Sequence, residues 1–220
     1  MSSNEISILD KFFSLANKSQ AEKNLYNLKR NKYSFKEDKV LGISMLQIKD
    51  TVKETEEVEI STVFKLIQSE YNEARILGWA LLVRDFSESS ILKYFILHEA
   101  KNCKNWNVVD FAAPICSKML IKRDGYEACE NVGYSLLFKE ESDLSVRFSL
   151  MMAVPFIKKE KLRYAIDIIE RCLDYSDPTI QQGCGQMLKE IGLINQNILK
   201  YFIKDHEERL SLIIKNELTK

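Results

Sequence analysis

Apolar side chains recur at every third or fourth position along most of the chain, which is the spacing of one face of an α-helix. The segment 73–86 shows this pattern, with Ala74, Leu77 and Leu81 on the face that would be buried. Segments of this kind follow one another along the chain, separated by short polar connections. The pattern therefore predicts an all-α protein.

From residue 57 onward the predicted helices group into hairpins with a period of about 35 residues, close to that of HEAT-like repeats. Such units stack into a right-handed α-α superhelix, or solenoid, and we expect the second helix of each hairpin to line its concave surface. A globular all-α bundle is the structural alternative. We predict one domain over 1–220, with N-terminal helices at 6–15 and 21–32 within 1–50. The hairpins, which together span 57–217, are 57–86, 90–121, 126–157, 161–191 and 195–217.

Composition excludes several classes of protein. The 220 residues include 45% hydrophobic side chains, enough for a core, but only seven glycines and three prolines, which disfavours β-sandwiches, barrels and glycine-rich phosphate loops. Five cysteines without a C-x-x-C pair indicate neither a disulfide framework nor a zinc site. No apolar run is long enough to cross a membrane, and the first residues lack the apolar core of a signal peptide. We therefore expect a reduced, cytoplasmic protein.

Charge is balanced overall but uneven along the chain. The 32 basic and 32 acidic residues cancel, which argues against a protein that coats nucleic acid nonspecifically. Yet 18–39 holds seven basic and three acidic residues, 101–123 holds five and one, and 51–70 has five glutamates against two lysines. These numbers predict a basic groove and an acidic exterior, although the basic residues of 18–39 also fit a solvated helix face.

Cations on the predicted inner helices are spaced in a way that suits a phosphate backbone. Lys158 and Lys159 form a basic turn between helices, which fits either a phosphate contact at the groove rim or a solvated turn. The candidate DNA-binding residues are Arg75, Arg84, Lys118, Lys189, Lys158 and Lys159.

Trp106 and Asp110 stand four residues apart in a predicted helix that opens at Asn105, so both lie on one face. The helix dipole favours a carboxylate near this end. An ionised carboxylate beside an aromatic face can stabilise a developing cation or orient the water that attacks it. Cleavage of an N-glycosidic bond generates such a cation on the sugar. The same spacing also fits a partly buried tryptophan and an aspartate with no chemical role.

Five segments then match a known pattern in order and spacing. Asn105–Asp110 contains a W-x-x-x-D signature, which is the most specific match, and Ser145–Phe148 matches a helix that carries an active-site arginine. Leu41–Ile43 resembles a Leu-Gly-Ile/Val turn, while Asn72–Asp85 and Asp177–Gly192 resemble inner helices. Together they resemble the AlkD family of HEAT-like-repeat DNA alkylation repair glycosylases over most of the chain.

This resemblance implies a monofunctional DNA glycosylase that hydrolyses the N-glycosidic bond of cationic alkylated purines, of the 3-methyladenine and 7-methylguanine type, in duplex DNA. It implies a monomer that needs no metal or other cofactor, holds DNA in a basic groove and has no deep base pocket. By position, Asp110 would stabilise the oxocarbenium-like sugar and position water. Trp106 would pack against the deoxyribose, and Arg147 would contact a phosphate or support Asp110.

The sequence departs from the family pattern at two places. The family commonly has a second active-site tryptophan on an inner helix, where this chain has Gln186. After Ile43 the chain leads directly to the acidic stretch 51–70 instead of a basic helix, which resembles a second, diverged subgroup of AlkD-like proteins. Two alternative functions therefore stay open. One is a noncatalytic HEAT-repeat protein that binds DNA structure, and the other is a protein-interaction scaffold.

Overall fold

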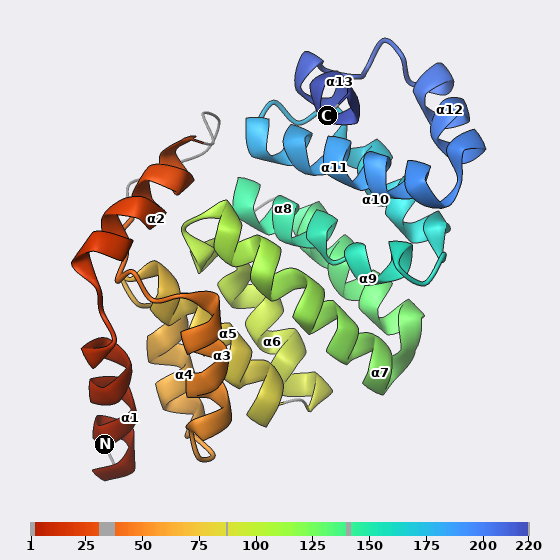
Figure 1. Ribbon diagram of the computed structural model, residues 1–220. Helices are drawn as coiled ribbons and strands as arrows, with labels where there is room; N and C mark the ends of the chain where they lie inside the picture. The colour runs from red at the N-terminus through yellow and green to blue at the C-terminus, as the bar shows by residue number, and fades with distance from the viewer. Residues whose placement is uncertain (1–2, 31–37, 87, 140–141, 220) are drawn as a thin grey trace.

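The computed structural model describes residues 3–30, 38–86, 88–139 and 142–219, and it forms helices with no β-strand among these residues (Figure 1). The all-α prediction is confirmed. The helices are α1 (Ser3–Ser14), α2 (Lys18–Arg30), α3 (Met45–Glu54), α4 (Ile60–Ile67), α5 (Asn72–Asp85), α6 (Ser89–Glu99), the 3₁₀ helix η1 (Ala100–Cys103), α7 (Trp106–Lys139), α8 (Asp143–Met151), α9 (Val154–Ile157), α10 (Leu162–Cys172), α11 (Pro178–Ile194), α12 (Gln196–Asp205) and α13 (Leu212–Thr219).

The helices stack in chain order from the N-terminal end to the C-terminal end (Figure 1). Helix α4 packs on α5, α6 on α7, α10 on α11, and both α12 and α13 on α11. Contacts also join the inner helices of neighbouring hairpins, from α5 to α7, α7 to α8 and α8 to α11. The predicted solenoid of helical hairpins is confirmed, and these inner helices carry the candidate site.

Helix α7 consists of two helices that meet at Gly125. The backbone of Gly125 has φ +86° and ψ 176°, which is not helical. A side chain added there would meet no atom within 4 Å, so glycine is needed for its backbone conformation and not for space. The break lies between two of the predicted hairpins, so the inner helix of one continues into the outer helix of the next.

Helix α3 was not predicted as a separate element. Ser44 accepts a hydrogen bond from the backbone N–H of Gln47 at 3.3 Å, while the Gln47 side chain accepts one from the Ser44 N–H at 2.9 Å. This reciprocal pair is a capping box, which starts the helix at Met45. The segment that we expected to lead directly to the acidic stretch therefore forms a helix that packs on α5.

The hydrophobic core extends through the stack. Trp79, which lies on α5, is completely buried and packs against Phe148 of α8 with ring centroids 5.4 Å apart. Inner helices of different hairpins are thereby joined by aromatic contact as well as by aliphatic packing. Within the described part of the chain, no helix has the length and apolar character that crossing a membrane requires.

All five cysteines are buried and free. Burial raises the pKa of the Cys103 thiol to about 12 and that of Cys129 to about 11, and it raises the pKa values of Cys116 and Cys184 well above the usual range. Because the thiolate is the reactive form, we expect no reaction of the native protein with Ellman's reagent at about pH 8. All five thiols should react after unfolding in guanidinium chloride. A thiol that reacts quickly in the native protein would contradict this packing.

Candidate active site

Trp106, Asp110 and Arg147 meet where helices α7 and α8 pack together. The Arg147 guanidinium donates two hydrogen bonds to the Asp110 carboxylate, from Nε to Oδ1 and from Nη2 to Oδ2, each 2.8 Å long. It also lies 5.8 Å from the centre of the Trp106 ring, within the range of a cation–π contact. The three residues that the resemblance singled out therefore form one cluster.

The exposure of this ion pair is unequal, since the Arg147 side chain is 1% exposed and the Asp110 side chain 28%. Arginine lies beneath the carboxylate and aspartate lies at the surface. Arg147 takes up one lone pair on each carboxylate oxygen, so each oxygen has another available to a ligand or water. The pair fixes the direction of the carboxylate without closing access to it.

Helix α11 holds Arg147 from the other side. Arg147 Nη1 donates to the carbonyl oxygen of Thr179 in the first turn of α11. Gly183 lies one turn further along, where an added Cβ would come 2.9 Å from side-chain atoms of Leu150 and Met151 and 3.3 Å from Arg147 Nη1. The small residue lets α11 approach α8 closely enough for this contact. Sequence reasoning missed both Thr179 and Gly183, because neither side chain carries the chemistry of the site.

Two adjoining hollows are lined by residues that follow Asp110 on α7, Arg147 on α8–α9 and Thr179 on α11. The lysine hollow has a volume of about 450 Å³, and the glutamine hollow about 400 Å³. Val154 and Lys158 line both. The lysine hollow is lined by Pro114, Ile115, Lys118, Ile121, Tyr126, Val154, Pro155, Lys158 and Lys159, and the glutamine hollow by Met151, Val154, Ile157, Lys158, Gln186, Met187 and Glu190.

The structure brings three of the predicted DNA-binding lysines together, because Lys118, Lys158 and Lys159 all line the lysine hollow and are exposed. Lys189 is half-buried on α11 and does not line either hollow. Gln186 is exposed and lines the glutamine hollow, so a flexible amide stands at the position where the family commonly has a tryptophan.

Arg84 has a structural role that the sequence did not reveal. It donates hydrogen bonds to the carbonyl oxygens of Val52, Thr55 and Glu56, at and just beyond the C-terminal end of α3. It also pairs with Asp85 at 2.5 Å. The guanidinium thus satisfies carbonyls that the end of a helix leaves without partners, and it is engaged there instead of facing a phosphate.

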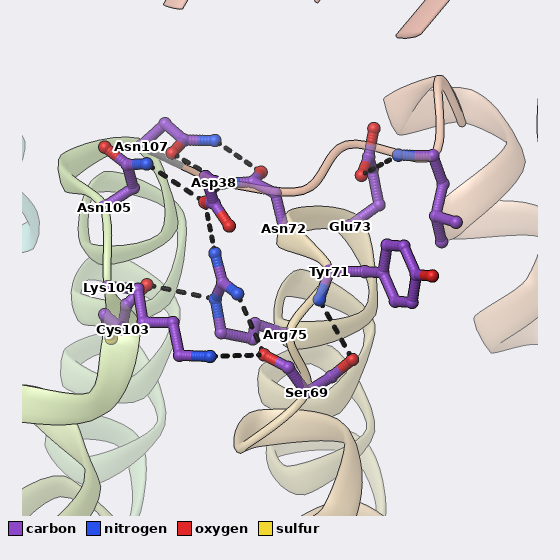
Figure 2. A network of polar contacts seen from close by, with 11 residues as sticks. Asp38, Ser69, Tyr71, Asn72, Glu73, Arg75, Cys103, Lys104, Asn105 and Asn107 are labelled. Atoms are coloured by element: carbon purple, nitrogen blue, oxygen red, sulfur yellow. Dashed lines mark hydrogen bonds and ion pairs between the residues drawn. The ribbon is translucent and has the colours of Figure 1, made fainter. Parts of the chain in front are cut away.

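Arg75 was also expected to contact DNA, but its side chain is completely buried at the centre of a polar network (Figure 2). Its guanidinium pairs with Asp38, which is 2% exposed, and donates to the carbonyl oxygens of Cys103 at 3.1 Å and Ser69 at 2.9 Å. A guanidinium in this position cannot reach a phosphate on the surface. Arg75 instead ties the segment before α3 to the start of α7.

The same network fixes the residues around Trp106. Asp38 accepts hydrogen bonds from the side-chain amides of Asn72 at 2.8 Å and Asn105 at 3.0 Å. The side-chain amides of Asn72 and Asn107 each donate a hydrogen bond to the Oδ1 atom of the other, at 3.0 and 2.8 Å, as Figure 2 shows. Trp106 lies in the sequence between Asn105 and Asn107, and the side chains of both are held by these hydrogen bonds. Asp38 has no neighbouring motif in the sequence that would have identified it.

The turn that leads into α7 is strained. Lys104 has φ +60°, and the N–H of Asn105 bonds to the carbonyl oxygen of Cys103 at 2.7 Å, which makes a γ-type turn. Such a conformation costs about 1–3 kcal/mol for a residue other than glycine. Arg75 donates to the same Cys103 carbonyl and helps to hold this turn. The network therefore stabilises an unfavourable backbone directly before the helix that carries Trp106 and Asp110.

Together, the fold and the cluster define a helical-repeat protein with a partly exposed carboxylate beside an aromatic side chain. Among the described residues, no group of three or more His, Cys, Asp or Glu side chains is placed to hold a metal ion. A family model described as DNA alkylation repair enzyme matches residues 8–217. The chain belongs to this family, and the resemblance stated from its motifs is confirmed.

A solved structure supports the fold. The crystal structure of AlkD2 from Streptococcus mutans superposes with a TM-score of 0.61 and 16% sequence identity, covering 91% of this chain and 98% of that one. At this identity the likeness establishes the common fold. A search of curated proteins finds no match.

Proposed function

We propose that the protein is a DNA glycosylase that releases cationic alkylated purines from duplex DNA. The observation that carries this proposal is the Asp110 carboxylate, held in one orientation by Arg147 beside Trp106 and still 28% exposed. Membership of the DNA alkylation repair family supports a DNA substrate. The residues suit a reaction in which positive charge develops on a sugar at the surface of the protein.

In the proposed reaction the bond between the sugar C1′ and the purine nitrogen breaks, and its electron pair leaves with the base. Because the alkylated purine is already cationic, it departs as a neutral molecule without needing an acid. The deoxyribose becomes oxocarbenium-like, and Asp110 stabilises this charge electrostatically. Trp106 packs against the sugar. Water attacks C1′ and gives its proton to the solvent, while Arg147 positions Asp110.

The lysine hollow is the proposed path of the phosphate backbone. Its three lysines, Lys118, Lys158 and Lys159, come from α7 and from the turn after α9. Lys118 lies on the same helix as Asp110, eight residues further along. Arg75 and Arg84 do not belong to this path, since the guanidinium of each is hydrogen-bonded to backbone carbonyl oxygens of the protein.

Replacing Lys158 and Lys159 by alanine should weaken duplex binding and make it less sensitive to salt. Each phosphate contact contributes about 0.9 to the slope of log affinity against log salt concentration, so the slope should fall by about 1–2. Fluorescence anisotropy over a salt series measures both effects. The matched control replaces Lys200 and Lys204, exposed on the outer helix α12, and should leave the slope unchanged. Equal slopes for the two double variants would contradict the proposed path.

Gln186 favours one alternative, a noncatalytic protein that binds DNA structure. An amide cannot supply the aromatic wall of a tryptophan, and a lost stacking contact costs about 1–3 kcal/mol. One experiment separates the candidates: the protein is incubated with a methylated duplex, and bound DNA and freed base are measured in parallel. Release of methylated purine supports a glycosylase. Binding without release supports the alternative. The absence of both binding and release supports a protein-interaction scaffold.

A further inference from the structure

Helix α7 contains a proline, one turn after the carboxylate of the candidate site. Pro114 stands four residues after Asp110, and α7 continues past it. Of the residues of α7, all of which the structure describes, Gly125 alone departs from helical backbone angles. Proline is the least favourable residue in a helix interior, because it lacks the N–H that a helix uses as a donor. A regular helix would therefore form more readily with almost any other residue at position 114.

The missing N–H concerns one particular acceptor. In an α-helix the N–H of each residue donates to the carbonyl oxygen four residues earlier, so the oxygen that loses its donor at Pro114 is the main-chain carbonyl of Asp110. Arg147 does not replace this donor, since its hydrogen bonds to Asp110 go to the two carboxylate oxygens. Asp110 therefore offers two kinds of acceptor at one place, a carboxylate and a main-chain oxygen without its helical partner.

Both acceptors lie among the other residues of the candidate site. Trp106, Asp110, Pro114 and Lys118 follow one another along α7 at intervals of four residues. Asp110 and Pro114 are half-buried, and Pro114 lines the lysine hollow. Because helical carbonyls point toward the C-terminal end of the helix, the Asp110 carbonyl is directed toward the edge of this hollow. It thus stands between the proposed sugar contact and the proposed path of the phosphates.

We propose that the main-chain carbonyl of Asp110, left without its helical donor by Pro114, is a second acceptor for the attacking water. The inference rests on the proposed function, because it concerns the water of that reaction. When the carboxylate accepts one hydrogen of the water and the carbonyl accepts the other, a lone pair of the water is directed toward the sugar. That lone pair forms the bond to C1′ as the purine leaves with its electron pair, and one proton of the water passes to the solvent.

The test restores the missing donor. Pro114→Ala supplies an N–H that should occupy the Asp110 carbonyl, and we expect single-turnover release of methylated purine to slow by about three- to tenfold, the usual effect of one hydrogen bond. The affinity for the methylated duplex should stay unchanged. The midpoint of urea unfolding should stay the same or rise, because alanine suits a helix interior better than proline. A slower reaction in a protein of equal or greater stability separates positioning of water from a structural role.

The products of the reaction report on the nucleophile itself. Methanol has one O–H hydrogen and cannot satisfy both acceptors, so the wild-type protein should discriminate against it in favour of water. When the reaction is run in dilute methanol, the ratio of methyl deoxyriboside to abasic site should be higher for Pro114→Ala than for the wild type. A proline that serves only the fold would leave this ratio unchanged.

Pro178→Ala is the matched control. Pro178 is the first residue of α11, where an N–H has no helical acceptor, and it lines neither the lysine hollow nor the glutamine hollow. This variant should keep the wild-type rate and product ratio. If the wild type releases base and Pro114→Ala gives the same product ratio, the inference is overturned and the proposed function stands. Absence of release by the wild type would overturn both.

Discussion

Asp110→Asn is expected to slow the release of methylated purine from duplex DNA by about 10²–10³-fold, the usual effect of removing an electrostatic group that acts in the transition state. An amide keeps the size of the carboxylate but loses the negative charge that opposes the developing sugar cation. Arg147 would also face an amide N–H₂ group in place of one carboxylate oxygen. Single-turnover release of base from a methylated duplex measures the chemical step directly.

The binding of DNA should respond much less than the rate, because Asp110 is not among the residues proposed to contact phosphate. The matched control is Asp124→Asn, on the same helix and paired with Lys93 at 2.8 Å, which should keep the wild-type rate. A rate for Asp110→Asn equal to that of the control would show that the carboxylate has no part in the reaction. A loss of duplex affinity in proportion to the rate would assign Asp110 to binding.

Arg75→Met is expected to lower the free energy of unfolding by about 3–5 kcal/mol, because it removes one partner of a buried ion pair. Methionine leaves the Asp38 carboxylate buried and, among the described residues, with the side-chain amides of Asn72 and Asn105 as its donors. It also removes the hydrogen bonds to the carbonyls of Cys103 and Ser69. Urea denaturation followed by circular dichroism gives the change in free energy.

The appropriate control is Arg209→Met, which breaks ion pairs with Asp174 and Glu170 at the surface. Exposed pairs of this kind contribute about 1 kcal/mol or less. Similar losses for the two variants would contradict the structural role assigned to Arg75. If Arg75 contacted DNA instead, its replacement would weaken duplex binding and leave stability nearly unchanged.

The solenoid could be predicted because its contacts repeat with the period of the sequence. Asp110 and Arg147 are 37 residues apart, and Asn72 and Asn107 are 35 residues apart, so in both pairs one hairpin contacts the next. Helical spacing and a repeat of about 35 residues therefore predict which helices are neighbours. Trp106, Asp110 and Arg147 were identified by the resemblance of Asn105–Asp110 and Ser145–Phe148 to the family pattern.

The roles of Arg75 and Arg84 could not be predicted in this way. Most of helix α5 is buried, including residues outside the face of Ala74, Leu77 and Leu81 that the helical spacing predicts, and Arg75 is one of them. An arginine on such a helix is assigned to the surface by default. Its true partner, Asp38, stands in a connection without helical spacing, 37 residues away. Only the three-dimensional structure brings such a pair together.

Helix α3 could have been found from its capping box. Ser44 and Gln47 have the three-residue spacing of that motif, directly before a run with apolar residues. The family pattern has a basic helix after this turn, and the helix that this chain forms there, Met45–Glu54, does not match it.

The repeat-to-repeat contacts have a further consequence for how the protein opens. In a solenoid, the free energy of unfolding is approximately the sum of the intrinsic stability of each unit and the stability of the interfaces between neighbouring units. Fraying therefore begins at the terminal units, which have one neighbour each. Helices α7 and α8 have packed helices on both sides, from α5 through α11. The carboxylate and its arginine thus lie in the segment that opens last, and the end helices can fray without disturbing their geometry.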